Sequence, residues 1–317
     1  ILSTFWQCGD GYRIDPYTLE QRGAESWTPL DGISAHPKVD ESTGELLFFN
    51  YSKHPPYQHY GVVDKNNKLI HYTAVPTPGP RLPHDMAFTK IYSILVDLPL
   101  FWDPELLKED RHHARFFPDT PTRFGIIPRY GKAEDVQWFE ADPTYVLHWM
   151  NAYEEDDEIV LEGYFQENPD PQPLPNMPKA VGKLMANIDE NSFQSKLHRW
   201  RFNLTTGAVS EEHLDDRILE FGSFNQQYAG QKTRYLYSTW TKPGWFLFSG
   251  IVKHDFETGK SWSLPFGEER FGSEAPFAPR VNAKDEDDGY LVSFITDMKR
   301  NRSECILVDA KDIEAGP

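Results

Sequence analysis

The sequence is poor in several features that define large classes of proteins. It has only two cysteines among 317 residues, Cys8 and Cys305, which form neither a disulfide framework nor a metal-binding spacing. It contains no apolar run of about 18 residues, the length that a membrane-spanning helix needs. It also shows no signal peptide. On these grounds we expect a cytoplasmic protein.

Positive charge is also scarce. The 32 Lys and Arg residues are outnumbered by 49 Asp and Glu residues, which gives a net charge of −17. A nucleic-acid partner is disfavoured because phosphates attract basic surfaces. Electrostatic docking on anionic lipid is disfavoured for the same reason. The acidic excess is more consistent with a contribution to solubility.

Helical periodicity is scarce, whereas strand-like runs rich in β-branched and aromatic residues recur along the chain. With 39% hydrophobic and 14% aromatic residues, the chain can build a substantial core. Only 104–111 has the character of a short helix, with Asp103 as its N-cap. The sequence therefore predicts an all-β fold. The predicted strands include 46–51, 90–98, 158–164, 233–239, 250–255, 290–296 and 305–308.

A short turn pattern recurs between these runs. Asp or Asn precedes x-x-Thr-Gly in 40–44, 203–207 and 255–259, and glycine supplies the positive φ that such hairpin turns require. The last two glycines are 52 residues apart, about the length of a four-stranded propeller blade. The pattern suggests a β-propeller, and it leaves a sandwich or another barrel open.

Three histidines stand in distinctive β-rich contexts: His36 before Pro37-Lys38, His84 before Asp85-Met86, and His148 before Trp149-Met150. They are separated by 48 and 64 residues, spacings that suit ligands supplied by successive repeat units and not by one helix. Neutral imidazole favours iron, zinc, copper and nickel. A single histidine beside a proline is more often a turn or core residue, so a metal site depends on their convergence.

These contexts belong to a longer series of motifs in which the chain resembles the carotenoid cleavage oxygenase family. Each motif is short, but their joint order along nearly the whole chain is specific. The motifs are Asp15-Pro16-Tyr17-Thr18-Leu19-Glu20, Ser34-Ala35-His36-Pro37-Lys38-Val39-Asp40, Thr43-Gly44-Glu45-Leu46, His84-Asp85, Asp97-Leu98-Pro99-Leu100, His148 with Asn151-Ala152-Tyr153-Glu154, Leu219-Glu220-Phe221, Arg234-Tyr235-Leu236-Tyr237, Gly272-Ser273-Glu274-Ala275-Pro276-Phe277 and Glu286-Asp287-Asp288-Gly289-Tyr290.

The resemblance implies a seven-bladed β-propeller that holds a non-haem Fe(II) near its axis with four histidines, under a cap of loops and short helices. His36, His84 and His148 would be three of the ligands. The fourth histidine would lie beyond Pro317, so we expect a single propeller domain over 1–317 that is truncated at both ends. By the same resemblance, Glu220 would orient His148, and Glu274 would orient the missing histidine.

The activity implied is the cleavage of an alkene C=C bond with O₂ into two carbonyl products. Stilbene-cleaving members carry a lysine where Trp6 falls in this chain. Because tryptophan cannot act as an ammonium donor but can line an apolar tunnel, a carotenoid or apocarotenoid is the favoured substrate. The alternatives are a phenolic stilbene and a propeller that binds a ligand without catalysis.

Three other clusters have competing interpretations. The apolar run Leu98-Pro99-Leu100-Phe101-Trp102, with Leu106 and Leu107, is predicted to be core; the alternative is an exposed patch that contacts a membrane peripherally to extract a lipophilic polyene. His112-His113 lies among charged residues and is predicted to be solvated. Glu286-Asp287-Asp288 is predicted to be an acidic turn and not a Ca²⁺ site.

Overall fold

A computed structural model describes residues 2–4, 9–30, 32–167, 169, 194–241 and 247–317. Within them, β-strands dominate, with one five-residue α-helix and three short 3₁₀ turns. All the strand pairings are antiparallel, and the predicted all-β class is confirmed. The seven predicted strands are all present, with their bounds shifted by at most three residues.

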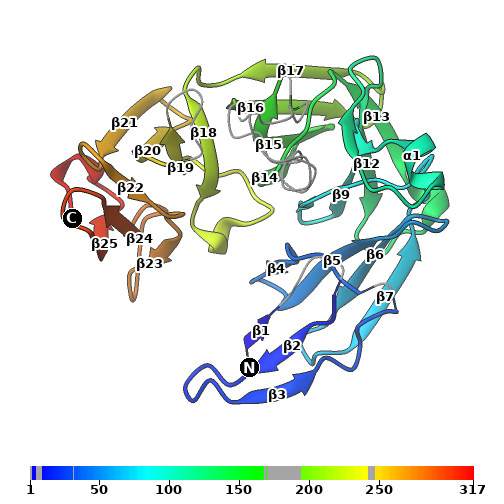
Figure 1. Cartoon of the computed structure of the whole chain (residues 1–317), viewed down its shortest axis with the longest axis horizontal. Helices are drawn as coiled ribbons and strands as arrows, with labels where there is room; N and C mark the ends of the chain where they lie inside the picture. Colours follow the sequence, from blue (N-terminus) through cyan, green and yellow to red (C-terminus); the bar gives the residue numbers. More distant parts are fainter. Residues whose placement is uncertain (1, 5–8, 31, 168, 170–193, 242–246) are drawn as a thin grey trace.

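Five four-stranded sheets follow one another along the chain. In Figure 1 they stand around an open arc, with β4, β14 and β18 on its inner side and β7, β17 and β21 on its outer side. The first two sheets are β4 (Lys38–Asp40), β5 (Glu45–Tyr51), β6 (Gln58–Val63) and β7 (Leu69–Ala74), then β8 (Ala87–Phe88), β9 (Tyr92–Asp97), β12 (Thr122–Pro128) and β13 (Gln137–Ala141). The third is β14 (Trp149–Glu155), β15 (Glu158–Gln166), β16 (Ser195–Asn203) and β17 (Val209–His213). The last two are β18 (Ile218–Ser223), β19 (Tyr235–Thr241), β20 (Gly250–Asp255) and β21 (Lys260–Pro265), then β22 (Arg270–Gly272), β23 (Phe277–Pro279), β24 (Gly289–Asp297) and β25 (Arg302–Asp309).

Two smaller sheets complete the strands. A three-stranded sheet of β1 (Leu2–Thr4), β2 (Tyr12–Ile14) and β3 (Gln21–Ala24) precedes β4 in the chain. The hairpin β10 (Leu100–Trp102) and β11 (Ala114–Phe116) is inserted between β9 and β12 and carries α1 (Pro104–Lys108). Asp103 caps α1 as predicted, because its carboxylate accepts the N–H groups of Glu105 and Leu106. The 3₁₀ turns are η1 (Ala133–Asp135), η2 (Gln226–Tyr228) and η3 (Ile313–Ala315).

The three predicted turns are hairpin turns. In each one the glycine has a positive φ, and the Asp or Asn side chain accepts backbone N–H groups two or three residues further on. Two of them join the third and fourth strands of consecutive sheets, whereas the turn at Gly44 joins the first and second strands of its sheet. The 52-residue spacing between Gly207 and Gly259 therefore corresponds to one structural repeat. The turn at Gly44 occupies a different place in its sheet and is not part of that repeat. The turn glycines are Gly44, Gly207 and Gly259, with φ of 74°, 75° and 69°.

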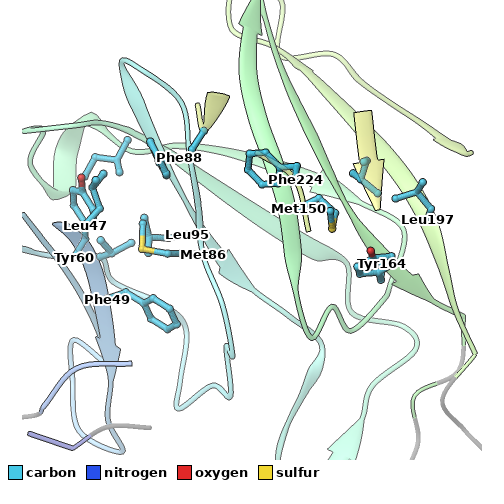
Figure 2. Packing of buried hydrophobic residues seen from close by; sticks show 14 of the residues in the cluster. Leu47, Phe49, Tyr60, Met86, Phe88, Leu95, Met150, Tyr164, Leu197 and Phe224 are labelled. Atoms are coloured by element: carbon cyan, nitrogen blue, oxygen red, sulfur yellow. The ribbon is translucent and has the colours of Figure 1, made fainter. Parts of the chain in front are cut away.

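Apolar side chains fill the space between neighbouring sheets. Figure 2 shows Leu47, Phe49 and Tyr60 of the first sheet facing Met86 and Leu95 of the second, and all five belong to one buried cluster. Full burial of such a side chain contributes about 1.5–3 kcal/mol. Packing between sheets, together with the strand ladders within them, therefore holds the inner strands in place.

Polar contacts also join each sheet to the next. At all four junctions a side chain from one sheet contacts the neighbouring sheet at the end of its first strand, in the loop that follows, or at the start of its second strand. Several of the motif residues therefore join one sheet to the next. The contacts join Arg129 to Asp40 and Glu45, Glu154 to Thr89 and Ile91, Asn151 to Gly230 and Gln231, and Glu286 to the backbone of Arg234 and Tyr235.

The apolar run in the inserted hairpin is largely core. Leu98, Leu100 and Phe101 are buried, and Phe101 stacks on Phe117 with ring centroids 4.3 Å apart. The half-buried Trp102 is the exception. Any membrane contact would therefore fall to Trp102 with Leu106 and Leu107, and it stays a prediction. Among the described residues, no helix is long and apolar enough to cross a membrane.

Candidate metal centre

The three predicted ligands come from three consecutive sheets. His36, His84 and His148 lie in the segments that lead into β4, β8 and β14, the first strand of each sheet. Because β4 and β14 lie on the inner side of the arc (Figure 1), a residue just before such a strand reaches the region around which the sheets are arranged. This position explains how residues 48 and 64 apart in sequence can meet.

The three imidazoles converge on one point. One ring nitrogen from each lies within 4.8 Å of the others, and this is the only group of three or more potential ligands found among the described residues. The Nε2 atoms of His36 and His84 are 2.9 Å apart. Metal–imidazole bonds are about 2.1 Å long for zinc, so two ligands at right angles on one ion lie about 3 Å apart. The spacing of His36 and His84 fits a shared ion.

Glu220 orients the third predicted ligand. Its Oε2 accepts a hydrogen bond from Nδ1 of His148 at 2.7 Å, and the carboxylate is 2% exposed. With Nδ1 protonated by this bond, Nε2 of His148 keeps its lone pair for a metal. Such a carboxylate–histidine pair fixes both the tautomer and the ring orientation of a ligand. Glu220 therefore occupies the place that the resemblance implied.

β-bulges shape the inner strands beside this pair. The register of β14 shifts between Trp149 and Ala152, directly after His148, and that of β18 shifts between Glu220 and Ser223. Within the second bulge, Phe221 has a φ of +50°, which is unusual for a residue other than glycine. Its ring lies 5.2 Å from that of His148. Bulges re-aim side chains, and this one directs Glu220 and Phe221 to the same imidazole.

Burial sets the charge of the ligands. It lowers the pKa of His36 to about 4, although Asp85 opposes the shift. Burial, together with the neighbouring His36 and His148, also lowers the pKa of His84 to about 4. Burial would likewise favour neutral His148, but the Glu220 carboxylate outweighs it and raises the pKa. At neutral pH, His36 and His84 are therefore uncharged, the form in which imidazole binds a metal.

Asp85 is the residue of this region to which the sequence assigned no role. It is 2% exposed, and it accepts hydrogen bonds from Lys38 and from the backbone N–H groups of Met86 and Trp149. Burial would raise its pKa, but Lys38 and the nearby imidazoles hold the pKa below its usual value. The sequence did contain a signal for Asp85, namely its position next to the predicted ligand His84. A carboxylate at such a position needs a hydrogen-bonding or charged partner if it is buried.

Among the described residues, no hydrogen bond or ion pair joins Glu274 to the three imidazoles. It lies between β22 and β23 and borders a cavity of about 520 Å³ that is also lined by Phe221 and Phe248. Since Phe221 packs against His148, the cavity is next to the histidine cluster. The orienting role of Glu274 stays a prediction.

The remaining candidates have other environments. His112 and His113 are exposed, as expected for solvated residues. The three carboxylates of the acidic turn are engaged within the chain. Glu286 accepts two backbone N–H groups, Asp287 pairs with Lys253, and Asp288 pairs with Arg280. Trp6, on which the substrate preference depends, lies outside the described residues.

Known proteins resemble the chain in sequence and in structure. The family model for the retinal pigment epithelial membrane protein matches residues 2–317. Carotenoid 9,10(9',10')-cleavage dioxygenase 1 of Arabidopsis thaliana is 37% identical over 300 residues, which cover 90% of this chain and 54% of the relative. Isoeugenol monooxygenase of Pseudomonas putida is 28% identical over 325 residues, or 96% of this chain and 66% of the relative.

Among solved structures, the lignostilbene dioxygenase of Pseudomonas brassicacearum superposes with a TM-score of 0.85 at 26% identity, covering 99% of this chain and 68% of that one. The chain spans about half the length of the first curated relatives that it matches. The family match extends over almost the whole chain, and the motifs quoted above lie within it. The chain therefore belongs to the retinal pigment epithelial membrane protein family, which includes the carotenoid cleavage oxygenases.

Proposed function

We propose that this chain carries most of the iron(II) centre of a dioxygenase that cleaves a C=C bond of a carotenoid or apocarotenoid with O₂, giving two carbonyl products. The observation that carries the proposal is the convergence of His36, His84 and His148 ahead of three consecutive inner strands. Imidazole nitrogens suit iron, copper, nickel and zinc. Relatives named as oxygenases favour a redox-active metal, which zinc is not.

The roles of the protein groups follow from their environments. Neutral His36 and His84 would bind the ion without cancelling its charge, and Glu220 would hold His148 with its free nitrogen facing the same point. The bound iron would supply the activation of O₂. A fourth histidine beyond Pro317, oriented by Glu274, would complete the ligand set. The complete fold would be a seven-bladed propeller forming one domain, with loops and short helices capping the site.

The cavity beside Phe221 supports a lipophilic polyene as substrate. Its lining includes the apolar Phe221, Phe248, Val292 and Phe294, and its polar side chains are Ser273 and Glu274. An apolar pocket with few polar groups suits a hydrocarbon chain better than a highly polar ligand. A second candidate substrate is a phenolic alkene, because relatives are named for isoeugenol and lignostilbene.

Metal binding is tested with the protein at its full natural length. Wild-type protein is expected to bind about one iron per chain, and His148→Ala should abolish that binding because a ligand is lost. His112→Ala is the matched control, since His112 is exposed on the inserted hairpin. If wild type remains iron-free after anaerobic Fe(II) reconstitution, the ligand-binding propeller without catalysis becomes the better account.

The substrate is tested by incubating the iron-loaded protein, first without and then with O₂, with an apocarotenal or a hydroxystilbene. O₂-dependent formation of a new aldehyde from the apocarotenal is the expected result. Cleavage of the stilbene alone would show that the substrate is a phenolic alkene, and that Trp6 does not indicate a preference for carotenoids.

A further inference from the structure

We propose that Asp85 is the positioning residue that holds the three ligand-bearing segments together, an inference that rests on the proposed metal centre. Each of these segments supplies one donor to its carboxylate. The donors are Lys38, two residues after His36, Met86, two residues after His84, and Trp149, directly after His148. One buried side chain therefore connects all three segments.

The contacts use both carboxylate oxygens. Oδ1 of Asp85 lies 2.7 Å from Nζ of Lys38 and accepts the N–H of Met86 at 2.7 Å. Oδ2 accepts the N–H of Trp149 at 2.9 Å. Of the three ligand-bearing segments, Glu220 contacts only that of His148, whereas the hydrogen bonds and ion pair of Asp85 reach all three.

The chemistry of the three donors requires a carboxylate at this position. An ionised carboxylate only accepts hydrogen bonds, and it has enough lone pairs for three N–H donors. Asparagine has one carbonyl oxygen and would turn an NH₂ group towards a donor. Lys38 supplies the opposite charge that a buried carboxylate needs, since breaking such a pair leaves an uncompensated charge. Asp85 can therefore link the segments without adding net charge beside the imidazoles.

The consequence is control of ligand geometry. The segments containing His36 and His148 belong to the first and third sheets, so an error in sheet docking would move their imidazoles relative to each other. Side chains that orient metal ligands change metal affinity by about 10- to 100-fold when they are replaced. We expect Asp85→Asn to have an effect in this range, with the three histidines intact.

The experiment measures Co²⁺ binding by visible absorption in the full-length protein, because the spectrum reports ligand geometry as well as occupancy. Asp85→Asn should lower the affinity by about 10- to 100-fold and alter the spectrum at saturating Co²⁺. Asp287→Asn is the matched control: it disrupts another buried Lys–Asp pair, also 2.7 Å long, which joins β20 to the loop between β23 and β24 and includes none of the three ligand-bearing segments. It should leave both Co²⁺ readouts at their wild-type values.

Lys38→Met provides a second variant if Asp85→Asn fails to fold, as judged by circular dichroism. It removes only the ammonium and should alter the spectrum in the same direction. Wild-type affinity and spectrum in a folded variant would overturn the role of Asp85 while leaving the metal centre intact. Equal effects of Asp85→Asn and Asp287→Asn would reduce the role to general stability. Absence of Co²⁺ and Fe²⁺ binding in wild type would instead refute the proposed function.

Discussion

Two histidine clusters lie at opposite edges of the sheets. At the inner edge, His36, His84 and His148 come from three sheets, and each offers a ring nitrogen to a common point. At the outer edge, His198 and His213 are cross-strand partners on β16 and β17 of one sheet. Nδ1 of His198 lies 2.9 Å from Nδ1 of His213, and its Nε2 lies 3.1 Å from Glu211.

The difference is in the number of imidazoles that converge and in how the remaining ring nitrogens are held. Both ring nitrogens of the outer His198 have protein partners, and among the described residues this pair belongs to no group of three potential ligands. At the inner edge, the bond to Glu220 occupies Nδ1 of His148 and directs the other nitrogen towards its neighbours. Proximity of histidines is therefore insufficient for a metal site. The backbone must bring three of them to one point, and a carboxylate on the second nitrogen, as at His148, fixes which nitrogen faces that point.

The largest expected effect separates the two clusters directly. His84→Ala should weaken Fe²⁺ or Co²⁺ binding by more than about 100-fold, because loss of a ligand exceeds the effect of an orienting group. His213→Ala should leave the affinity unchanged. Metal titration of both variants checks the comparison, and it fails if His213→Ala produces the larger loss.

A smaller effect is expected from the carboxylates. Glu220→Gln keeps an acceptor for Nδ1 of His148 but removes the charge, so metal affinity should fall by about 10- to 100-fold. Glu211→Gln makes the same change beside His198 and should have no effect. The same titration is used, and equal affinities of the two variants would contradict the assignment of Glu220.

The smallest effect concerns the stability of the fold at low pH, since the two clusters can be compared only while the protein stays folded. Burial would raise the pKa of Asp40, but Ser42, Lys90 and Arg129 lower it to about 2, compared with about 3.9 in an unfolded chain. Its ionised form therefore stabilises the fold above about pH 4. This contribution, about 2 kcal/mol, is lost as the pH falls towards 2.

Asp40→Asn tests this contribution. Asn203 shows that an amide can make the same turn hydrogen bonds, so the variant mainly removes the ion pairs with Lys90 and Arg129. The free energy of unfolding, measured with urea, should fall by about 2 kcal/mol at pH 7. The difference from wild type should shrink as the pH falls from 4 to 2. A difference that does not vary with pH would contradict the ion-pair explanation.

The sequence was informative where structure is encoded locally. β-branched and aromatic runs predicted the strands, and Asp103 predicted the start of α1, because each depends on nearby residues. The turn pattern predicted a hairpin at Gly44 but not its place within the sheet. A turn of five residues specifies backbone direction and contains no information on strand order.

The candidate site was predictable to a different extent. Family motifs predicted that His36, His84 and His148 converge and that Glu220 lies behind His148; the rings do converge and the hydrogen bond is present, whereas their role as metal ligands stays a prediction. The contacts of Asp85 could not be predicted, because two of its donors are backbone or side-chain groups more than 40 residues away. The bulge at Phe221 likewise depends on the pairing of β18 with β19.

The supply of ligands by separate sheets has a consequence for unfolding. His36 and His148 are 112 residues apart, so their imidazoles can bind one ion only while the intervening sheets stay docked. A ligand that binds the native state alone stabilises it by mass action. Metal would therefore oppose the separation of the sheets from one another more than the fraying of their outer strands. The loaded protein should unfold as a more cooperative unit than the metal-free chain.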